Sequence, residues 1–154
     1  MRIAVLADTH TDRLEHLPRK VIDALSGVDL VIHAGDFTDL QLLTDLKRLK
    51  EVKAVHGNMD SRQLKSILPI KELIEANGKR IGITHGSGAP WGIEERVREA
   101  FESDRVDIIV YGHSHTSQSK VINDILFFNP GKAADSFGII TIDGDAKGEV
   151  ISSR

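Results

Sequence analysis

Residues 31–36 read Val-Ile-His-Ala-Gly-Asp, an apolar run that ends abruptly in Gly-Asp. A Gly-Asp pair after a strand is ordinarily a turn. Four other apolar runs in the chain also end next to a polar residue of metal-binding type, and these residues are Asp8, Asn58, His85 and His113. Because the pattern recurs at five places, we interpret Asp36 as the central carboxylate of the set, which bridges two metal ions.

The chain has 154 residues, enough for one domain with a substantial core, and we expect a single domain over residues 1–154. Hydrophobic residues make up 40% of the sequence, charged residues 28%, and the formal net charge is −3. This charge gives no basic footprint for a nucleic-acid backbone. No apolar run approaches the ~18 residues that cross a bilayer. Neither nucleic acid nor a membrane is therefore an expected partner.

The sequence contains no cysteine. Disulfides, cysteine nucleophiles and thiolate metal sites are therefore excluded, and any metal must be held by imidazole, carboxylate or amide groups. The N-terminal residues form a strand-like run, Arg2–Ala7, without a signal-peptide cleavage pattern. From these two observations we expect a cytoplasmic protein.

Strands and helices are predicted to alternate over the first two thirds of the chain. Continuously apolar runs predict buried strands over 2–7, 29–33, 52–56 and 107–111. Helices are expected from Pro18 to Gly27, from the N-cap Asp39 to Leu49, after the N-cap Ser61, and over a face formed by Ile93, Val97 and Phe101.

The remaining runs predict more strands. Asn77-Gly78 is a strong hairpin turn between strands over 70–76 and 79–84. Further strands are expected over 120–123, 125–128, 137–142 and 149–151. The last third is therefore mostly antiparallel, and the whole order predicts an α/β domain with two packed sheets flanked by helices.

The polar residues at the strand ends are expected to converge. In an open α/β sheet the ligand site lies beyond the carboxyl ends of the strands, so parallel neighbouring strands would bring these side chains to one edge of the sheet. Two further histidines follow at i+2 spacing, which aims both members of each pair at one centre. The predicted ligands are Asp8, His10, Asp36, Asn58, His85, His113 and His115.

Seven protein ligands are too many for one ion that has four to six positions and must still bind substrate, whereas two ions that share Asp36 can use them all. Two ions roughly 3.5–4 Å apart can clamp the attacking and leaving oxygens of a phosphate displacement and lower the pKa of a bridging water. A shell of nitrogen and oxygen without sulfur suits Mn²⁺, Fe, Zn²⁺ or Ni²⁺.

Five short motifs resemble those of the calcineurin-like metallophosphoesterases, in that family's usual order. They are Asp8-Thr9-His10, Gly35-Asp36, Gly57-Asn58-Met59-Asp60, Thr84-His85-Gly86 and Gly112-His113-Ser114-His115. The small size of the chain and Asn129-Pro130-Gly131 are similar to the compact branch of the family, the YfcE/MJ0936-type phosphodiesterases. The resemblance spans residues 2–142.

The resemblance implies a four-layer α/β/β/α sandwich of the metallo-dependent phosphatase type. It also implies hydrolysis of a small phosphoester by a metal-bridging hydroxide, with Mn²⁺ as the usual supporting metal. One ion would lie on Asp8, His10, Asp36 and His115. The other would lie on Asp36, Asn58, His85 and His113.

Two positions depart from the family pattern. Many members carry a histidine where this chain has Met59, and a methionine cannot transfer a proton. We therefore assign no catalytic side chain as a general acid, which favours substrates with good leaving groups. The second departure is Ser87, which stands where this branch often has another histidine, and we interpret it as a substrate contact.

The first functional hypothesis is thus a dinuclear metal-dependent phosphodiesterase. A phosphomonoesterase or nucleotide phosphatase is the alternative within the same chemistry. A non-catalytic scaffold is the alternative from another class, because a binding subunit of the retromer coat (Vps29) resembles this branch but has eroded ligands. All seven ligands are intact here, which favours catalysis. Sheet edges and Trp91 suggest a homodimer.

Alternatives stay open for four further polar residues. His33 and His56 lie inside predicted strands, where a histidine is more often a hydrogen-bonded core or edge residue. Asp60 either orients Asn58 or a metal-bound histidine or is a helix cap or turn residue. Asn129 either faces the site or belongs to a turn.

Glycine at a strand end lets the backbone turn tightly, and this is the reason we assign to Gly35, Gly57 and Gly112.

Overall fold

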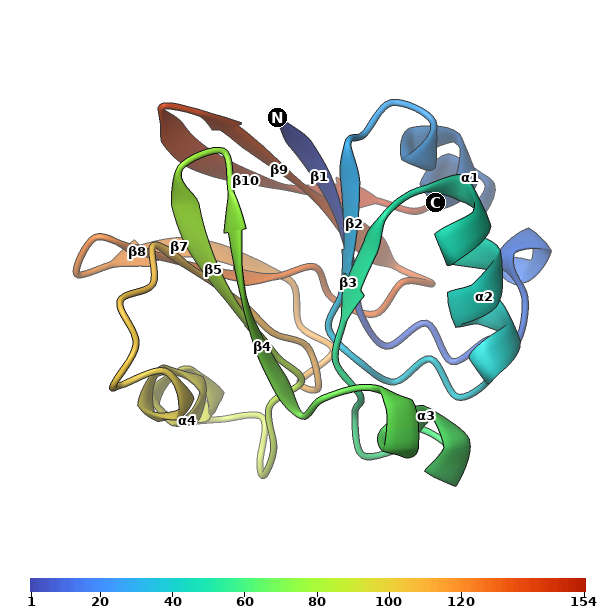
Figure 1. Cartoon of the computed structure of the whole chain (residues 1–154), viewed down its shortest axis with the longest axis horizontal. Coiled ribbons are helices and arrows are strands. Elements are labelled where there is room, and N and C mark those ends of the chain that lie inside the picture. The colour runs from blue at the N-terminus through green and yellow to red at the C-terminus, as the bar shows by residue number, and fades with distance from the viewer.

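The structure, a computed structural model that describes residues 1–154, contains two five-stranded sheets (Figure 1). The first sheet consists of β1 (Arg2–Leu6), β2 (Leu30–His33), β3 (Val52–Ala54), β9 (Ser136–Asp143) and β10 (Asp145–Ser152). Its strand order is β10-β9-β1-β2-β3. The three strands β1, β2 and β3 are parallel, and β9 and β10 add an antiparallel ribbon on the other side of β1.

The second sheet consists of β4 (Lys71–Ala76), β5 (Lys79–Thr84), β6 (Ile108–Val110), β7 (Gln118–Ile122) and β8 (Ile125–Asn129). Its strand order is β4-β5-β6-β8-β7. The predicted hairpin at Asn77-Gly78 is confirmed, since β4 and β5 are antiparallel around two residues with positive φ. The last third is mostly antiparallel, as expected, since β7 pairs with β8 and β9 pairs with β10 in this way. The exception is the parallel pairing of β8 with β6, which arises because the β7–β8 hairpin inserts β8 next to β6.

Four α-helices and one short 3-10 helix connect the strands. They are η1 (Leu14–His16), α1 (Arg19–Leu25), α2 (Leu40–Leu49), α3 (Arg62–Ile67) and α4 (Ile93–Ala100). Both predicted side-chain caps are confirmed: Asp39 accepts a hydrogen bond from the amide of Gln41 at 2.7 Å, and Ser61 accepts one from Leu64 at 3.2 Å. None of these helices combines the length and the apolar character that crossing a membrane requires.

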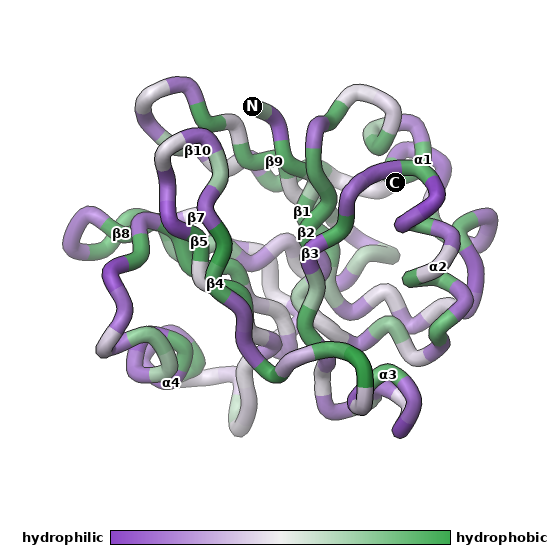
Figure 2. The backbone as a smooth tube through the Cα atoms, viewed as in Figure 1, coloured by the Kyte–Doolittle hydropathy of each residue, from purple (hydrophilic) through white to green (hydrophobic).

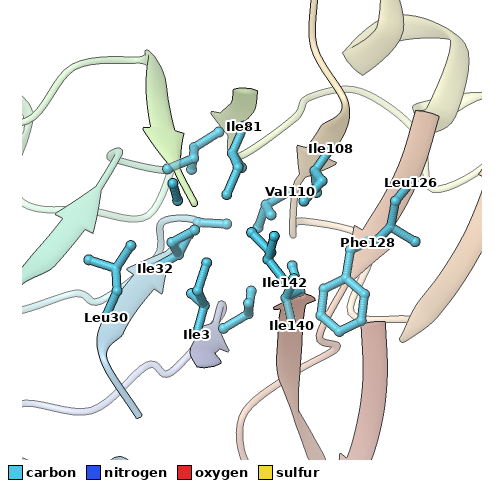
Figure 3. Close-up of a cluster of buried hydrophobic side chains, with 14 of the residues drawn as sticks. Ile3, Leu30, Ile32, Ile81, Ile108, Val110, Leu126, Phe128, Ile140 and Ile142 are labelled. Carbon is cyan, nitrogen blue, oxygen red and sulfur yellow. The ribbon is translucent and has the colours of Figure 1, made fainter. Parts of the chain in front are cut away.

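Three apolar cores separate four layers, and the predicted α/β/β/α sandwich is confirmed. Between the sheets, aliphatic side chains of both inner faces interdigitate with Phe128 (Figure 3). A second core packs α1 and α2 on the outer face of the first sheet, and a third packs α4 on the outer face of the second. Figure 2 shows the same arrangement as hydrophobic segments along the strands and hydrophilic segments in the outer turns.

The polar residues that end the strands meet between two sheets, and the expectation that they meet at the edge of one sheet is wrong. The loops after β1, β2 and β3 belong to the first sheet, whereas the loops after β5 and β6 belong to the second. Two hydrogen bonds join the two sets: Nδ1 of His85 donates to the carbonyl of Ala34 at 2.7 Å, and the amide of His113 donates to Oδ2 of Asp8 at 3.1 Å. The parallel strands of both sheets therefore end at the same side of the molecule.

Candidate metal centre

Backbone strain is concentrated at the predicted ligands. Asp8 follows β1 and Asp36 follows β2, and both adopt positive φ angles, 50° and 61°. Three of the histidines also have positive φ angles, which are 46° at His10, 66° at His113 and 59° at His115. Such residues each cost about 1–3 kcal/mol and persist where the surrounding structure fixes them, most often at functional sites.

The ligand atoms converge on two buried carboxylates. Oδ1 of Asp8 lies 3.4 Å from Nε2 of His115, 3.8 Å from Nε2 of His85 and 4.0 Å from Nε2 of His10. Oδ2 of Asp36 lies 3.3 Å from Nε2 of His85 and 4.0 Å from Nε2 of His10. These five residues therefore form one cluster in which carboxylate oxygens and imidazole nitrogens face each other.

Three atoms of this cluster are buried without a hydrogen-bond partner: Oδ1 of Asp8, Nε2 of His10 and Nε2 of His85. A buried polar atom without a partner costs about 1–3 kcal/mol, so three that face one another need a common partner. Oxygen and nitrogen lone pairs on neighbouring side chains are the donor set of a divalent cation. The residues present thus fit a metal centre.

The ionisation of the cluster is consistent with a site built for positive charge. Burial raises the pKa of the Asp8 carboxyl above its ordinary value. Burial would also raise the pKa of Asp36, but the neighbouring His85 outweighs it and the pKa of Asp36 is lowered. Conversely, burial would lower the pKa of His85, yet its contacts with Asp36 and Asp8 raise it. The two carboxylates therefore favour positive charge at this point of the cluster.

Hydrogen bonds to main-chain carbonyls fix two of the imidazole rings. His85 uses its Nδ1–H on Ala34, and His113 donates from Nε2 to the carbonyl of Gly88 at 2.8 Å. The other ring nitrogen of each then carries a lone pair, as a metal-binding imidazole requires. The rings also form two edge-on pairs, His10 with His115 at 5.6 Å and His85 with His113 at 5.2 Å between centroids.

Two predicted ligands are placed less centrally than the others. The ring of His113 contacts His85 but lies outside the cluster around the two carboxylates. The side chain of Asn58 is exposed and forms no hydrogen bond, and its loop is joined to the centre by the neighbouring amide of Met59, which donates to Oδ1 of Asp36 at 2.9 Å. The structure thus brings five of the seven residues together.

The sequence of residues 1–143 matches the family described as the calcineurin-like phosphoesterase superfamily domain. The chain belongs to this superfamily. A metallophosphoesterase is a phosphoester hydrolase, and membership implies divalent metal ions, in agreement with the donor set described above.

Individual relatives place this phosphoesterase in the expected compact branch. The probable metallophosphoesterase MJ0623 of Methanocaldococcus jannaschii is 44% identical over 133 residues, 85% of this chain and 67% of the relative. Phosphodiesterase MJ0936 of the same organism is 30% identical and aligned over 92% of this chain and 90% of its own length. The crystal structure of Vps29 complexed with zinc from Entamoeba histolytica is 26% identical, covers 100% of both chains and superposes with a TM-score of 0.78.

Asp60 organises the first-sheet side of this phosphoesterase site. Its side chain is 5% exposed and accepts three main-chain hydrogen bonds. Oδ2 accepts from the amides of Asp36 at 3.0 Å and Gly57 at 2.7 Å, and Oδ1 accepts from Thr38 at 2.8 Å. Asp60 therefore closes the turn that begins at Gly57 and also orients a predicted ligand, which is Asp36 and not Asn58 or a histidine.

Arg96 organises the second-sheet side. This role could not be predicted from the sequence, because Arg96 is one of several charged residues on α4. Its guanidinium donates to the carbonyls of Ser87 at 2.8 Å and Trp91 at 3.1 Å, and also to that of Ala89. The loop over residues 85–92 is thus tied to α4 at three points. This loop presents the carbonyl of Gly88 that holds His113.

Glycine occupies the three strand ends for two different structural reasons. Gly35 has φ of 96°, so our interpretation as a tight turn holds there. Gly57 and Gly112 do not adopt positive φ, so backbone conformation does not explain the glycine at these two positions. A Cβ on Gly57 would lie 2.1 Å from Oδ1 of Asp36, and a Cβ on Gly112 would lie 2.9 Å from Oδ2 of Asp8. These two glycines leave the space that the carboxylates occupy.

His33 lies behind the metal centre and does not face it. The fully buried ring accepts a hydrogen bond from the amide of Gly35 on Nδ1, which leaves Nε2–H to donate to Oγ1 of Thr9 at 3.1 Å. Thr9 in turn donates to the carbonyl of Asp36 at 3.3 Å. Burial holds the pKa of His33 well below its ordinary value, so the ring is neutral. Its role is to join two ligand loops.

Asn129, at the end of β8, is also a bracing residue. Its buried side chain donates to the carbonyl of Gly112 at 3.1 Å and to Oγ of Ser114 at 3.0 Å, and accepts from the amide of Gly131 at 2.9 Å. It therefore fixes the loop that carries His113.

Proposed function

We propose that this chain is a dinuclear metal-dependent phosphodiesterase that hydrolyses a small phosphodiester. The observation that carries the proposal is the cluster of facing, partner-free donor atoms around Asp8 and Asp36. The two edge-on imidazole pairs support a division into two ions. One ion would be held by Asp8, His10, Asp36 and His115, and the other by Asp36, Asn58, His85 and His113.

When bound, two divalent ions supply Lewis-acid activation of a water and neutralise the charge of the phosphate. We assign Mn²⁺ as the working metal, with Fe, Zn²⁺ and Ni²⁺ as ions of compatible ligand chemistry. The chain's own part is positional. Asp60 and Arg96 fix the loops, and the carbonyls of Ala34 and Gly88 set the tautomers of His85 and His113.

The side chain at the position where many family members carry a histidine cannot protonate the leaving group. Met59 is 59% exposed beside Asn58, and its thioether has no proton to give. The substrate preference should therefore favour alcohols or phenols that leave easily as anions. This is the reason to test aryl esters first.

The test compares bis(p-nitrophenyl) phosphate with p-nitrophenyl phosphate, using metal-stripped protein with and without Mn²⁺. We expect Mn²⁺-dependent hydrolysis of the diester over the monoester. Asp36→Asn and His113→Ala should abolish it, whereas the matched controls Asp23→Asn and His16→Ala, at exposed positions outside the site, should not. Full activity in either metal-loaded site variant would contradict the dinuclear proposal.

The other outcomes separate the alternatives. A preference for the monoester would favour a phosphomonoesterase or nucleotide phosphatase. Two bound ions per chain without hydrolysis of either ester would favour a scaffold, to which the superposition on Vps29 gives a specific basis. The cytoplasmic location, the absence of a nucleic-acid partner and the homodimer stay predictions.

A further inference from the structure

A cavity of about 430 Å³ beside the metal centre carries positive charge without any carboxylate. Two of the predicted ligands, Asn58 and His85, form part of its lining. Its basic side chains are Lys65, Lys71 and Arg96, and none of its lining residues is Asp or Glu. The chain as a whole has 23 acidic and 20 basic residues. The positive cavity is therefore a local feature that the overall composition does not explain.

All three cations have hydrogen-bond donors left for a ligand. Arg96 uses three of its five donors on the carbonyls of its loop. Nζ of Lys65 donates to the carbonyl of Asn58 at 2.9 Å and forms no ion pair. Nζ of Lys71 donates to the carbonyl of Ala100 at 2.7 Å and lies 3.4 Å from a carboxylate oxygen of Asp104. Since an ammonium group has three donors, Lys65 and Lys71 can each bind a further acceptor.

Three apolar residues also line the cavity. Ile70 is 69% exposed, which is unusual for so large an aliphatic side chain, and Val97 and Ala100 line the same cavity. Figure 2 shows the chain between α3 and β4 as a hydrophobic segment. Cavities that combine apolar walls with a few placed polar groups are typical of sites for organic ligands.

We propose that this cavity is a subsite for one arm of the phosphodiester, and that it selects an arm carrying a second anionic group. Lys65 and Lys71 bind that anion through charge-assisted hydrogen bonds, and Ile70 contacts the apolar part of the arm. The proposal rests on the proposed function, which places the reacting phosphate beside His85 and Asn58. A carboxylate and a phosphate share the required chemistry.

Three aryl diesters test the proposal. Each has one p-nitrophenyl arm, and the other arm is phenyl, p-carboxyphenyl or a phenyl ring with a p-phosphate group. Release of either phenol is followed by chromatography, so that the result does not depend on which arm leaves. We expect kcat/KM to be about tenfold higher for the anionic arms than for phenyl, as one charge-assisted hydrogen bond provides. The carboxylate and phosphate arms show which anion is preferred.

The variants Lys65→Gln and Lys71→Gln locate the effect. Each should reduce the ratio of kcat/KM for the anionic and phenyl diesters at least threefold. Lys47→Gln on α2 removes the same charge at an exposed site away from the cavity, and it should keep the wild-type ratio. Equal kcat/KM for the three diesters, or a preference that survives both cavity variants, would overturn the subsite.

A binding measurement separates this proposal from the proposed function. Isothermal titration of the Mn²⁺-loaded protein with phenylphosphonate and p-carboxyphenylphosphonate requires no turnover. We expect about tenfold tighter binding of the carboxylated probe to the wild type, and a smaller ratio in Lys65→Gln and Lys71→Gln. Equal affinities would overturn the subsite even if the diesters are hydrolysed. The expected affinities without any hydrolysis would instead count against the phosphodiesterase alone.

Discussion

The two sides of the metal centre are held by opposite charges. On the first-sheet side, the Asp60 carboxylate accepts hydrogen bonds from three amide N–H groups, one of which belongs to the predicted ligand Asp36. On the second-sheet side, the Arg96 guanidinium donates to three carbonyls of the 85–92 loop and is connected to the predicted ligand His113 only through Gly88.

This difference separates a rigid side from an adjustable one. Asp60 is buried and bonded directly to a ligand residue, so its loss should affect both the fold and the metal. Arg96 is half-buried and acts through a loop whose tip, at Trp91, is exposed. Its loss should affect the metal more than the fold.

Asp60→Ala should have the largest effect. It leaves three amides without an acceptor, and since each buried unsatisfied group costs about 1–3 kcal/mol, we expect the free energy of unfolding to fall by about 3 kcal/mol or more. Urea denaturation of the metal-free protein measures this loss, with the exposed Asp23→Ala as the control. A loss below about 1 kcal/mol would show that water replaces the carboxylate and that the first-sheet side is not rigid.

Gly57→Ala should come next, because its Cβ would lie 2.1 Å from Oδ1 of Asp36. We expect about 1–3 kcal/mol of destabilisation from overpacking and a loss of metal affinity of about tenfold or more, as for other residues that orient ligands. Metal titration and thermal unfolding measure the two effects. The matched control is Gly27→Ala, where the nearest atom lies 3.8 Å from the added Cβ. Equal behaviour of the two variants would mean that the Asp36 carboxylate can move without loss.

The candidate ligands can be predicted from a local sequence pattern, whereas the residues that hold them in place cannot. Buried strands that end in Asp, Asn or His leave a local pattern, and the caps Asp39 and Ser61 are local too. Asp60 and Arg96 bind main-chain groups, which any residue can supply, so no pattern of side chains predicts their contacts.

The distribution of the predicted ligands over two sheets could not be predicted from the sequence either. Each strand end reads the same whether its neighbours belong to one sheet or to two, and the parallel pairing of β8 with β6 depends on contacts distant in sequence. The glycines are a second case in which contacts distant in sequence leave no local pattern. Gly57 and Gly112 look like turn residues, but their absent side chains make room for carboxylates that come from other loops.

Arg96→Gln should have a smaller effect on stability and a clear effect on metal binding. We expect about 1–2 kcal/mol of destabilisation, because the half-exposed carbonyls can be hydrated, and about a tenfold loss of metal affinity through His113. Hydrogen exchange of the 85–92 loop should rise in parallel. Arg96→Lys keeps the charge but lacks the planar fork, so it should resemble the glutamine variant. Wild-type metal affinity in Arg96→Lys would show that the charge alone matters.

Trp91→Ala should have the smallest effect and tests whether the adjustable side is held from its base or from its tip. Trp91 is 79% exposed, and only its carbonyl is bound by Arg96, so removing the side chain should change the free energy of unfolding by less than about 0.5 kcal/mol. Metal affinity should remain that of the wild type. A loss as large as in Arg96→Gln would mean that contacts of the indole, in the monomer or across the predicted homodimer, hold the loop. Size-exclusion chromatography of the two variants separates these cases, because only a dimer contact changes the elution volume.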